Sequence, residues 1–344
     1  MNIGIIGCGR VAAFHVFAYS YIKNANIVAI SDLNLKTARA FAAKYGIKKV
    51  FTDHKDLCET KDLDFVDICT PVSTHVNIAC DVAESGHNVL IEKPMALTTA
   101  ECERMIDAAK RNGVKLSVCH NQKFIPNIMK AKAMVDSGDY DLASFRASIQ
   151  ESAELIGAPK WVLTPAQKGG LWESGCHAAY LQLLFLKDIK EVYAVGSKIK
   201  NPVYDDLSVL LRTSDQSHGI IELSWIAKQV EITYELASSD GRKTRILNYN
   251  LLEEQAADRP KHVWSGLYVD ARRSMKKWVK PAIDGVTKGK IVYCLPHLNL
   301  INRYIESLEN DSPLPVTPEE GKNAIKLLEC IEESLDTHKI VPMK

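Results

Sequence analysis

Residues 2–13 read N-I-G-I-I-G-C-G-R-V-A-A, an apolar run that two glycines interrupt and that continues as helix-forming sequence without proline. A strand, a tight turn and a helix in this order, with the spacing G-x-G-x-x-A, are typical of a dinucleotide-binding βαβ unit. Gly7 would permit the sharp turn, Gly9 would let the backbone approach a pyrophosphate, and Ala12 would keep the helix close to the strand. The unpaired N–H groups at the start of the helix would then face the phosphates.

A second apolar run, residues 27–31, ends at Asp32. A carboxylate at this position can accept both ribose hydroxyls of the adenosine half and would repel a 2′-phosphate. We therefore expect NAD as the cofactor in preference to NADP, although Lys36 and Arg39 in the following helix would soften that preference. Asp32 could also cap the helix that starts at Leu35, and the two roles are compatible.

The composition is that of a soluble enzyme. The chain has 344 residues, of which 46% are hydrophobic and 25% charged, with a net charge of +1, so we expect two domains and no general affinity for nucleic acid. It has no apolar run of membrane-spanning length, and it opens on a strand instead of a signal segment, so we expect a cytoplasmic protein. Its nine cysteines include no C-x-x-C pair, which indicates reduced core residues and no metal site.

Strands and helices alternate through residues 1–120, which predicts a doubly wound parallel sheet, the Rossmann fold. Strand-like runs follow at residues 65–69, 88–91 and 115–119, with helix-period segments at residues 35–45, 75–85 and 99–112. Ligands bind beyond the carboxyl ends of such strands, so Thr70, Pro71, Glu92 and Lys93 are expected near the nicotinamide.

Residues 121–344 are predicted to form an α+β domain with a mainly antiparallel, open sheet, because their strand-like runs follow one another at short, hairpin-like spacing. That this domain binds substrate and mediates oligomerisation is what the family resemblance described below implies. The predicted strands are residues 143–151, 191–196, 207–213, 219–225, 231–238 and 243–248. The predicted helices are residues 128–137, 171–186, 298–309 and 318–335.

Three motifs are similar to those of the Gfo/Idh/MocA oxidoreductases: G-C-G-R-V-A with Asp32, C-T-P-V-S-T-H followed by H-N-V-L-I-E-K-P, and G-G-L-W-E-S-G-C-H. The resemblance extends along nearly the whole chain. It implies an NAD-dependent dehydrogenase or reductase that acts on a secondary alcohol of a sugar, cyclitol or nucleotide sugar, and a homodimer or homotetramer. The family also includes glycoside hydrolases that oxidise their substrate transiently and NAD-binding regulators that do not catalyse, so both alternatives stay open.

The resemblance assigns the chemistry to Lys93 and His177, with Glu173 beside them. An ammonium at Lys93 would stabilise a developing alkoxide, and His177 would take the alcohol proton as a general base. Glu173 and His177 are four residues apart and would share one face of a helix, where Glu173 would orient the substrate or the imidazole. The chain departs from the family at Glu173 and Tyr180, where aspartate is usual. Without a catalytic role, Lys93 would be an exposed lysine at the start of a helix, and His177 would be a histidine of the core.

The full set of expected site residues combines those derived above from the glycine turn and the strand ends with those that the resemblance implies. The expected cofactor contacts are Gly7, Gly9, Arg10, Val11, Asp32, Thr70, Pro71, His75, Glu92 and Lys93. The expected substrate contacts are Lys93, Lys123, Trp161, Glu173 and His177. His75 could instead pack against its helix, Lys123 could be a solvated surface residue, and Trp161 could pack over a domain junction.

The segment of residues 261–290 concentrates positive charge, with eight lysines and arginines against two aspartates, a local charge of +6. We interpret this segment first as a solvated basic face or a subunit contact. If it is functional, a phosphorylated or nucleotide-linked sugar would explain it better than an anionic membrane surface.

Overall fold

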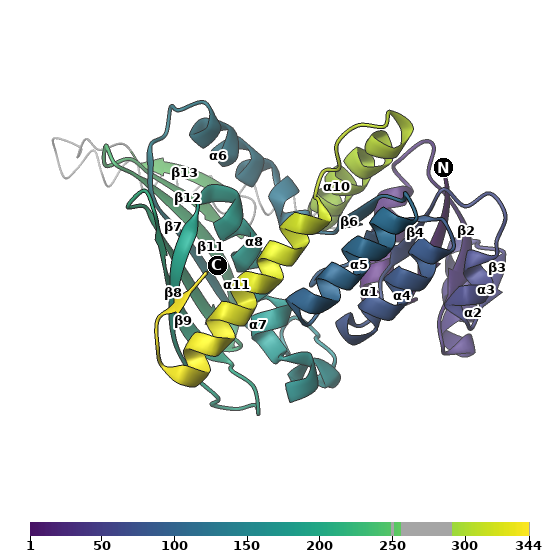
Figure 1. Ribbon diagram of the computed structural model, residues 1–344, viewed down its shortest axis with the longest axis horizontal. Helices are drawn as coiled ribbons and strands as arrows, with labels where there is room; N and C mark the ends of the chain where they lie inside the picture. The colour runs from purple at the N-terminus through teal and green to yellow at the C-terminus, as the bar shows by residue number, and fades with distance from the viewer. Residues whose placement is uncertain (249–250, 256–290, 344) are drawn as a thin grey trace.

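The computed structural model describes residues 1–248, 251–255 and 291–343. They form two sheets that lie side by side, with the long helix α11 (Pro318–Thr337) running between them (Figure 1). The basic segment of residues 261–290 lies outside the described residues.

The first sheet is parallel throughout, with the strand order β3-β2-β1-β4-β5-β6. Its strands are β1 (Asn2–Ile6), β2 (Asn26–Ser31), β3 (Lys49–Phe51), β4 (Phe65–Ile68), β5 (Asn88–Ile91) and β6 (Leu116–Val118). Its helices are α1 (Arg10–Tyr19), α2 (Leu35–Tyr45), α3 (His54–Cys58), α4 (Val72–Glu84) and α5 (Thr99–Arg111). The Rossmann topology predicted for this part of the chain is confirmed, whereas the short elements β3 and α3 were not predicted.

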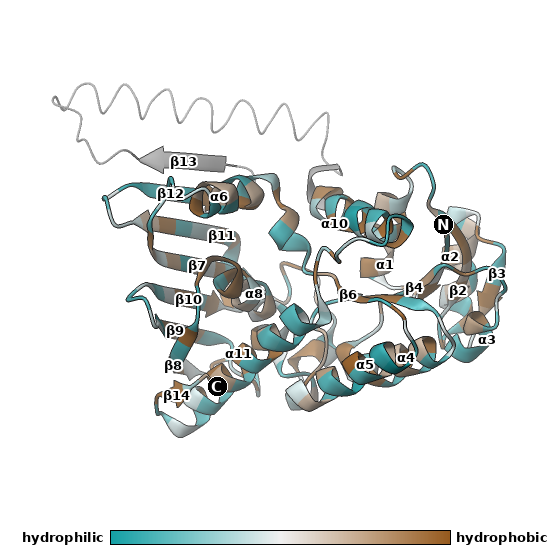
Figure 2. Ribbon diagram, turned by 45° about the horizontal axis from the view of Figure 1, so that its top comes forward, coloured by the Kyte–Doolittle hydropathy of each residue, from teal (hydrophilic) through white to brown (hydrophobic). Residues whose placement is uncertain are grey.

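The residues of the central strands are almost all buried, because helices cover both faces of a doubly wound sheet. In Figure 2, α5 and α11 carry both hydrophilic and hydrophobic residues, as expected of helices with one apolar face. Both helices begin with a capping box, formed by Thr98 with Glu101 and by Thr317 with Glu320.

The second sheet has the order β13-β12-β11-β7-β10-β9-β8-β14. Among the described strands of this second sheet only β7 and β10 pair in parallel, so the prediction of a mainly antiparallel sheet is confirmed. Its strands are β7 (Leu142–Ser152), β8 (Ile189–Ser197), β9 (Asp206–Thr213), β10 (His218–Ser224), β11 (Ile226–Ser238), β12 (Lys243–Leu247), β13 (Leu251–Gln255) and β14 (Val341–Pro342). Along β9, buried and exposed side chains alternate, so only one face of the sheet is covered.

The prediction of one helix over residues 171–186 is wrong. The structure has two helices, α7 (Gly169–Glu173) and α8 (Gly175–Phe185), which meet at Ser174. The hydroxyl of Ser174 donates to the buried carboxylate of Glu151 and accepts a hydrogen bond of 2.9 Å from the indole nitrogen of Trp225. A serine held in this way beside a glycine breaks the helix, so Glu173 and His177 lie on different helices.

Two helices near the end of the chain return to the first sheet. The helix α10 (Ile291–Glu309) packs against α1, and α11 packs against both α5 and α8. Gly321 lies so close to the first sheet that an added Cβ would come within 2.7 Å of both Met95 and Val118. The helix α6 (Pro126–Asp136) and the 3₁₀ turn η1 (Asn121–Phe124) connect the two sheets.

Among the residues that the structure describes, none of the helices combines the length and the apolar character that a bilayer crossing requires.

Candidate active site

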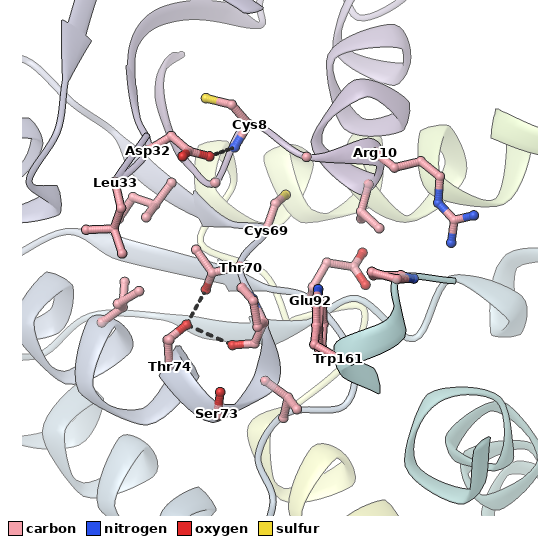
Figure 3. A pocket seen from close by; sticks show the side chains of 18 of the residues that line it. Cys8, Arg10, Asp32, Leu33, Cys69, Thr70, Ser73, Thr74, Glu92 and Trp161 are labelled. Atoms are coloured by element: carbon pink, nitrogen blue, oxygen red, sulfur yellow. Dashed lines mark hydrogen bonds between the residues drawn. The ribbon is translucent and has the colours of Figure 1, made fainter. Parts of the chain in front are cut away.

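A cavity of about 690 Å³ lies beyond the carboxyl ends of the parallel strands (Figure 3). The glycine turn and Asp32 line one part of it, and Lys93, Glu173 and Trp161 line another. The cavity therefore brings together residues of the first sheet and its loops with residues of η2 (Lys160–Leu163) and α7 from the second part of the chain. Of the expected contact residues it includes Gly7, Gly9, Arg10, Val11, Asp32, Thr70, Pro71, Glu92, Lys93, Trp161 and Glu173.

The glycine turn has the form that a dinucleotide phosphate requires. Gly7 has a φ of +93°, and a Cβ at this position would meet the carbonyl oxygen of Cys69 at 2.6 Å. A Cβ on Gly9 would meet no atom within 4 Å, and Gly9 also lines the cavity, so a ligand can approach its backbone closely. The N-terminus of α1 has no side-chain cap, and its first N–H groups are therefore open to an anion.

Asp32 follows β2 and closes the same turn. One of its carboxylate oxygens accepts the N–H of Cys8 at 2.9 Å, and the other accepts the N–H of Asn34 at 2.8 Å (Figure 3 shows the bond to Cys8). These bonds fix the carboxylate at the rim of the cavity. The side chain of Asn34, and not that of Asp32, caps α2 by accepting the N–H groups of Lys36 and Thr37.

Lys93 follows β5 and forms an ion pair with Glu173 from α7. Its Nζ lies 2.9 Å from Oε1 of Glu173 and 3.1 Å from the carbonyl oxygen of the same residue. Burial opposes the charge on Lys93, but the carboxylates of Glu173 and Glu92 outweigh burial and raise the pKa of Lys93. Lys93 is therefore a permanent cation, and an ammonium with three donors retains one for a ligand after these two bonds.

His177 lies beside this ion pair on α8. Its Nδ1 lies 2.6 Å from the hydroxyl of Tyr180, so Tyr180 and not Glu173 orients the imidazole. Burial lowers the pKa of His177 well below its usual range, and the ammonium of Lys93 lowers it further. The two groups proposed for proton transfer therefore hold opposite protonation states, a cationic lysine and a neutral histidine, as in sites that need an acid and a base at one pH.

A buried ion triad that the sequence analysis missed lies behind the cavity. His15 on α1 lies 2.7 Å from Asp67 and 2.8 Å from Glu92, and Tyr19 donates a bond of 2.7 Å to Asp67. Burial opposes protonation of His15, but Asp67 outweighs it and the pKa of His15 is raised well above its usual value. Asp67 interrupts an otherwise apolar strand sequence. Because a buried charge needs an oppositely charged or hydrogen-bonding group, this aspartate was the signal in the sequence for a buried partner side chain.

The same region holds side chains of metal-binding type. The ligand atoms of His15, Glu92, Cys119 and His297 all lie within 4.8 Å of one another, and all four residues are buried. His15 is already paired with two carboxylates, and burial raises the pKa of the Cys119 thiol well above its usual value. The hydrogen bonds and charges of the ion triad therefore account for this cluster as it stands.

Three of the expected site residues do not line the cavity: His75, Lys123 and His177. The ring of His75 lies 2.9 Å from the carbonyl oxygen of Thr70 and 3.0 Å from that of Pro94, so it ties the turn after β4 to the cis peptide of Lys93 and Pro94. The ammonium of Lys123 bonds to Glu320 on α11.

Comparison with known proteins assigns the chain to a family. Residues 1–120 match the oxidoreductase family with an NAD-binding Rossmann fold, and residues 128–243 match the GFO/IDH/MocA C-terminal domain. The chain belongs to the Gfo/Idh/MocA oxidoreductase family. It is therefore an NAD-binding oxidoreductase. This agrees with the glycine turn and with Asp32, both of which line the cavity.

Similar proteins share the whole length of the chain. The myo-inositol 2-dehydrogenase of Thermotoga maritima is 25% identical over 363 residues, which cover 100% of this chain and 99% of that protein. Two solved structures share the fold: the WlbA dehydrogenase of Bordetella pertussis in complex with NADH and UDP-GlcNAcA, and levoglucosan dehydrogenase in complex with NADH and L-sorbose. The first has a TM-score of 0.83 and 21% identity, and covers 99% of this chain and 97% of that one. The second has a TM-score of 0.84 and 21% identity, and covers 100% of this chain and 99% of that one.

Proposed function

We propose that this protein is an NAD-dependent dehydrogenase or reductase that transfers a hydride between nicotinamide and a secondary alcohol of a sugar, cyclitol or nucleotide sugar. The observation that carries the proposal is the cationic Lys93, held by Glu173 in the cavity that begins at the glycine turn, with the neutral His177 beside it. Relatives named as inositol and levoglucosan dehydrogenases support the substrate class.

The cofactor would occupy the cavity along the glycine turn. Gly9 and the uncapped start of α1 fit a pyrophosphate, and the carboxylate of Asp32 fits the two hydroxyls of an adenosine ribose. Because a 2′-phosphate would meet the negative charge of Asp32, we propose NAD in preference to NADP. When bound, the nicotinamide would supply hydride acceptance and donation.

The residues of this chain would handle the oxygen and the proton. The remaining N–H of Lys93 would bind the carbinol oxygen and stabilise the developing alkoxide in a site with little water. His177 would take the hydroxyl proton on Nε2, because its low pKa leaves it neutral at physiological pH. In the reductive direction the same histidine would return that proton. Glu173 would hold the ammonium in place.

The exposed ring of Trp161 would face the substrate. This side chain is 43% exposed although it lines the cavity on the turn η2 (Lys160–Leu163). An aromatic face at the edge of a cavity suits the apolar face of a sugar ring. A substrate contact by Lys123 would require Lys123 to leave Glu320.

We propose that the chain forms a homodimer or homotetramer through the uncovered face of the second sheet. This face carries apolar side chains that point away from the helices, among them Tyr193 on β8 and Leu210 on β9, which are 40% and 50% exposed. Exposed apolar groups on neighbouring strands are typical of an interaction surface. Neither a membrane nor nucleic acid is proposed as a partner, and we propose a cytoplasmic location.

The deciding experiment is NAD(H) turnover followed by absorbance, with NAD and NADP offered separately. The substrates would be free sugars, inositols, sugar phosphates and UDP-sugars. Reduction of NAD with one of these classes would support the proposal and identify the class. Tight binding of NAD without turnover of any substrate would refute it, and a glycoside-cleavage assay would then separate a hydrolase from a regulator that only binds NAD.

A further inference from the structure

His177 begins a chain of hydrogen bonds that runs away from the cavity. Its Nδ1 lies 2.6 Å from the hydroxyl oxygen of Tyr180, which lies 3.4 Å from Oδ1 of Asn121. The amide nitrogen of Asn121 then donates to Nε2 of His297 at 3.0 Å. The chain crosses from α8 through η1 to α10, and so joins three segments that are far apart in the sequence.

The amide of Asn121 gives this chain a direction. Burial and the neighbouring His15 lower the pKa of His297 to about 3, so its ring is neutral and can accept the Asn121 N–H. The oxygen of the same amide then faces Tyr180 and can only accept. In the bond between these two residues Tyr180 is therefore the donor and Asn121 the acceptor.

The phenolic oxygen has a further fixed contact, because the backbone N–H of Gln122 donates to it at 3.1 Å. The contacts with Gln122, Asn121 and His177 can all be satisfied in one way. The oxygen accepts from Gln122, donates to Asn121, and accepts from Nδ1–H of His177. The neutral ring must then carry its proton on Nδ1, which leaves the lone pair of Nε2 unprotonated.

We propose that Tyr180, oriented by Asn121 and His297, is a positioning residue that selects the Nδ1–H tautomer of His177 and so prepares Nε2 to act as the base. This inference rests on the proposed function for its catalytic consequence. Within the described part of the chain, Nε2 of His177 has no hydrogen-bond partner, and the residue as a whole is half-buried, so Nε2 keeps its lone pair for a substrate hydroxyl.

The surroundings keep this arrangement rigid. The ring of Tyr180 is 3% exposed and stacks on the ring of His120, with the ring centres 4.1 Å apart and the planes within 16°. Among the described residues, the charged and titratable groups around His177 include Lys93 and Glu92 after β5, Glu173 on α7, His120 after β6, His297 on α10 and Tyr180 on α8 itself. Of these, Tyr180 is the one that bonds to the ring.

The test is nitrogen NMR of the protein labelled with ¹⁵N-histidine, in the full chain without substrate. The resonances of His177 would be assigned by their absence in His177→Gln. We expect a protonated Nδ1 and an unprotonated Nε2 in the wild type, and loss of this preference in Tyr180→Phe and in Asn121→Leu. Tyr234→Phe is the matched control. It also removes the hydroxyl of a buried tyrosine, but that hydroxyl donates to the side-chain oxygen of Gln122 and forms no bond to His177.

Kinetics supply the second readout. Tyr180→Phe should lower kcat for alcohol oxidation by about 10- to 100-fold with little change in KM, a smaller loss than the roughly 10²–10⁴-fold contribution of a complete general base. Tyr180→Asp should restore an acceptor for Nδ1–H and move the acidic limb of the pH profile upward, because a carboxylate stabilises the imidazolium. The inference would be overturned by an Nε2–H tautomer of His177 in the wild type. It would also be overturned if Tyr180→Phe kept the same preference for Nδ1–H as the wild type. The NMR result does not require turnover, so a failure of the proposed function would be seen separately.

Discussion

The ammonium nitrogen of Lys93 lies 2.9 Å from Oε1 of Glu173 and 3.1 Å from the carbonyl oxygen of the same residue. The lysine follows a strand of the first sheet, and the glutamate ends a short helix that packs against the second sheet. The ion pair therefore joins the two parts of the molecule at the point where the proposed chemistry takes place.

Replacement of Lys93 should remove the charge that stabilises the alkoxide. We expect Lys93→Met to lower kcat by at least the roughly 10²–10³-fold that loss of one oxyanion donor costs. The dissociation constant for NAD, measured by fluorescence quenching, should change little. Lys115→Met is the matched control, because Lys115 is also a partly buried lysine that bonds to a carbonyl oxygen, that of Ser307. Near-normal turnover in Lys93→Met would contradict the assigned role.

The low pKa of His177 predicts the acidic limb of the pH profile. A free histidine gains its proton near pH 6.5, whereas His177 stays neutral to well below that value. Because the base acts in its neutral form, kcat/KM for alcohol oxidation should stay level as the pH falls through 6.5 and should decline only at lower pH. A decline centred at or above 6.5 would show that His177 is not the group that titrates.

The charge of Asp32 should govern the choice between NAD and NADP. Asp32→Asn keeps the shape of the side chain and one carbonyl oxygen but removes the charge that would repel a 2′-phosphate. We expect the ratio of kcat/KM for NAD over NADP to fall by about tenfold or more, which corresponds to ~1.4 kcal/mol. Asp53→Asn, which replaces the carboxylate that caps α3, is the control. An unchanged ratio would remove Asp32 from the account of specificity.

The buried triad should make a large contribution to stability that depends on pH. Asp67→Asn leaves His15 paired with Glu92 alone and removes the charged acceptor of the Tyr19 hydroxyl, so it should reduce the free energy of unfolding by about 1–3 kcal/mol at neutral pH. The folded-state pKa of His15 lies above its unfolded value of 6.5, so its stabilisation is complete below 6.5 and is lost as the pH rises toward the folded pKa.

The difference between wild type and Asp67→Asn, measured by equilibrium urea unfolding, should therefore shrink above pH 6.5, by at most about 1.4 kcal/mol per pH unit. Glu92, whose pKa is depressed through its contacts with His15 despite burial, behaves in the opposite sense. Its contribution is complete above its unfolded pKa of 4.5 and is lost as the pH falls toward the folded value. A difference that stays constant from pH 6.5 upward would mean that His15 is not protonated in the folded protein.

Local patterns predicted those parts of the structure that depend on local chemistry. The first sheet could be predicted from the glycine turn, Asp32 and the alternation of strands and helices, because periodicity and turn residues act over a few positions. The prediction of a single helix over residues 171–186 was wrong, because the break at Ser174 depends on Glu151 and Trp225, which are distant in the sequence. Tyr180 was noted only as a departure from aspartate, and its contact with Asn121 follows from tertiary packing that spacing does not reveal.

Gly321 shows how tightly the end of the chain is built into its beginning. A side chain there would strike Met95 and Val118, while α10 shields α1. A fragment ending near residue 120 would expose the apolar flanks of both α1 and α5 to water. A cofactor-binding half cut from this protein would therefore aggregate unless those flanks were redesigned, and grafting it onto another partner would require carrying the C-terminal helices along with it.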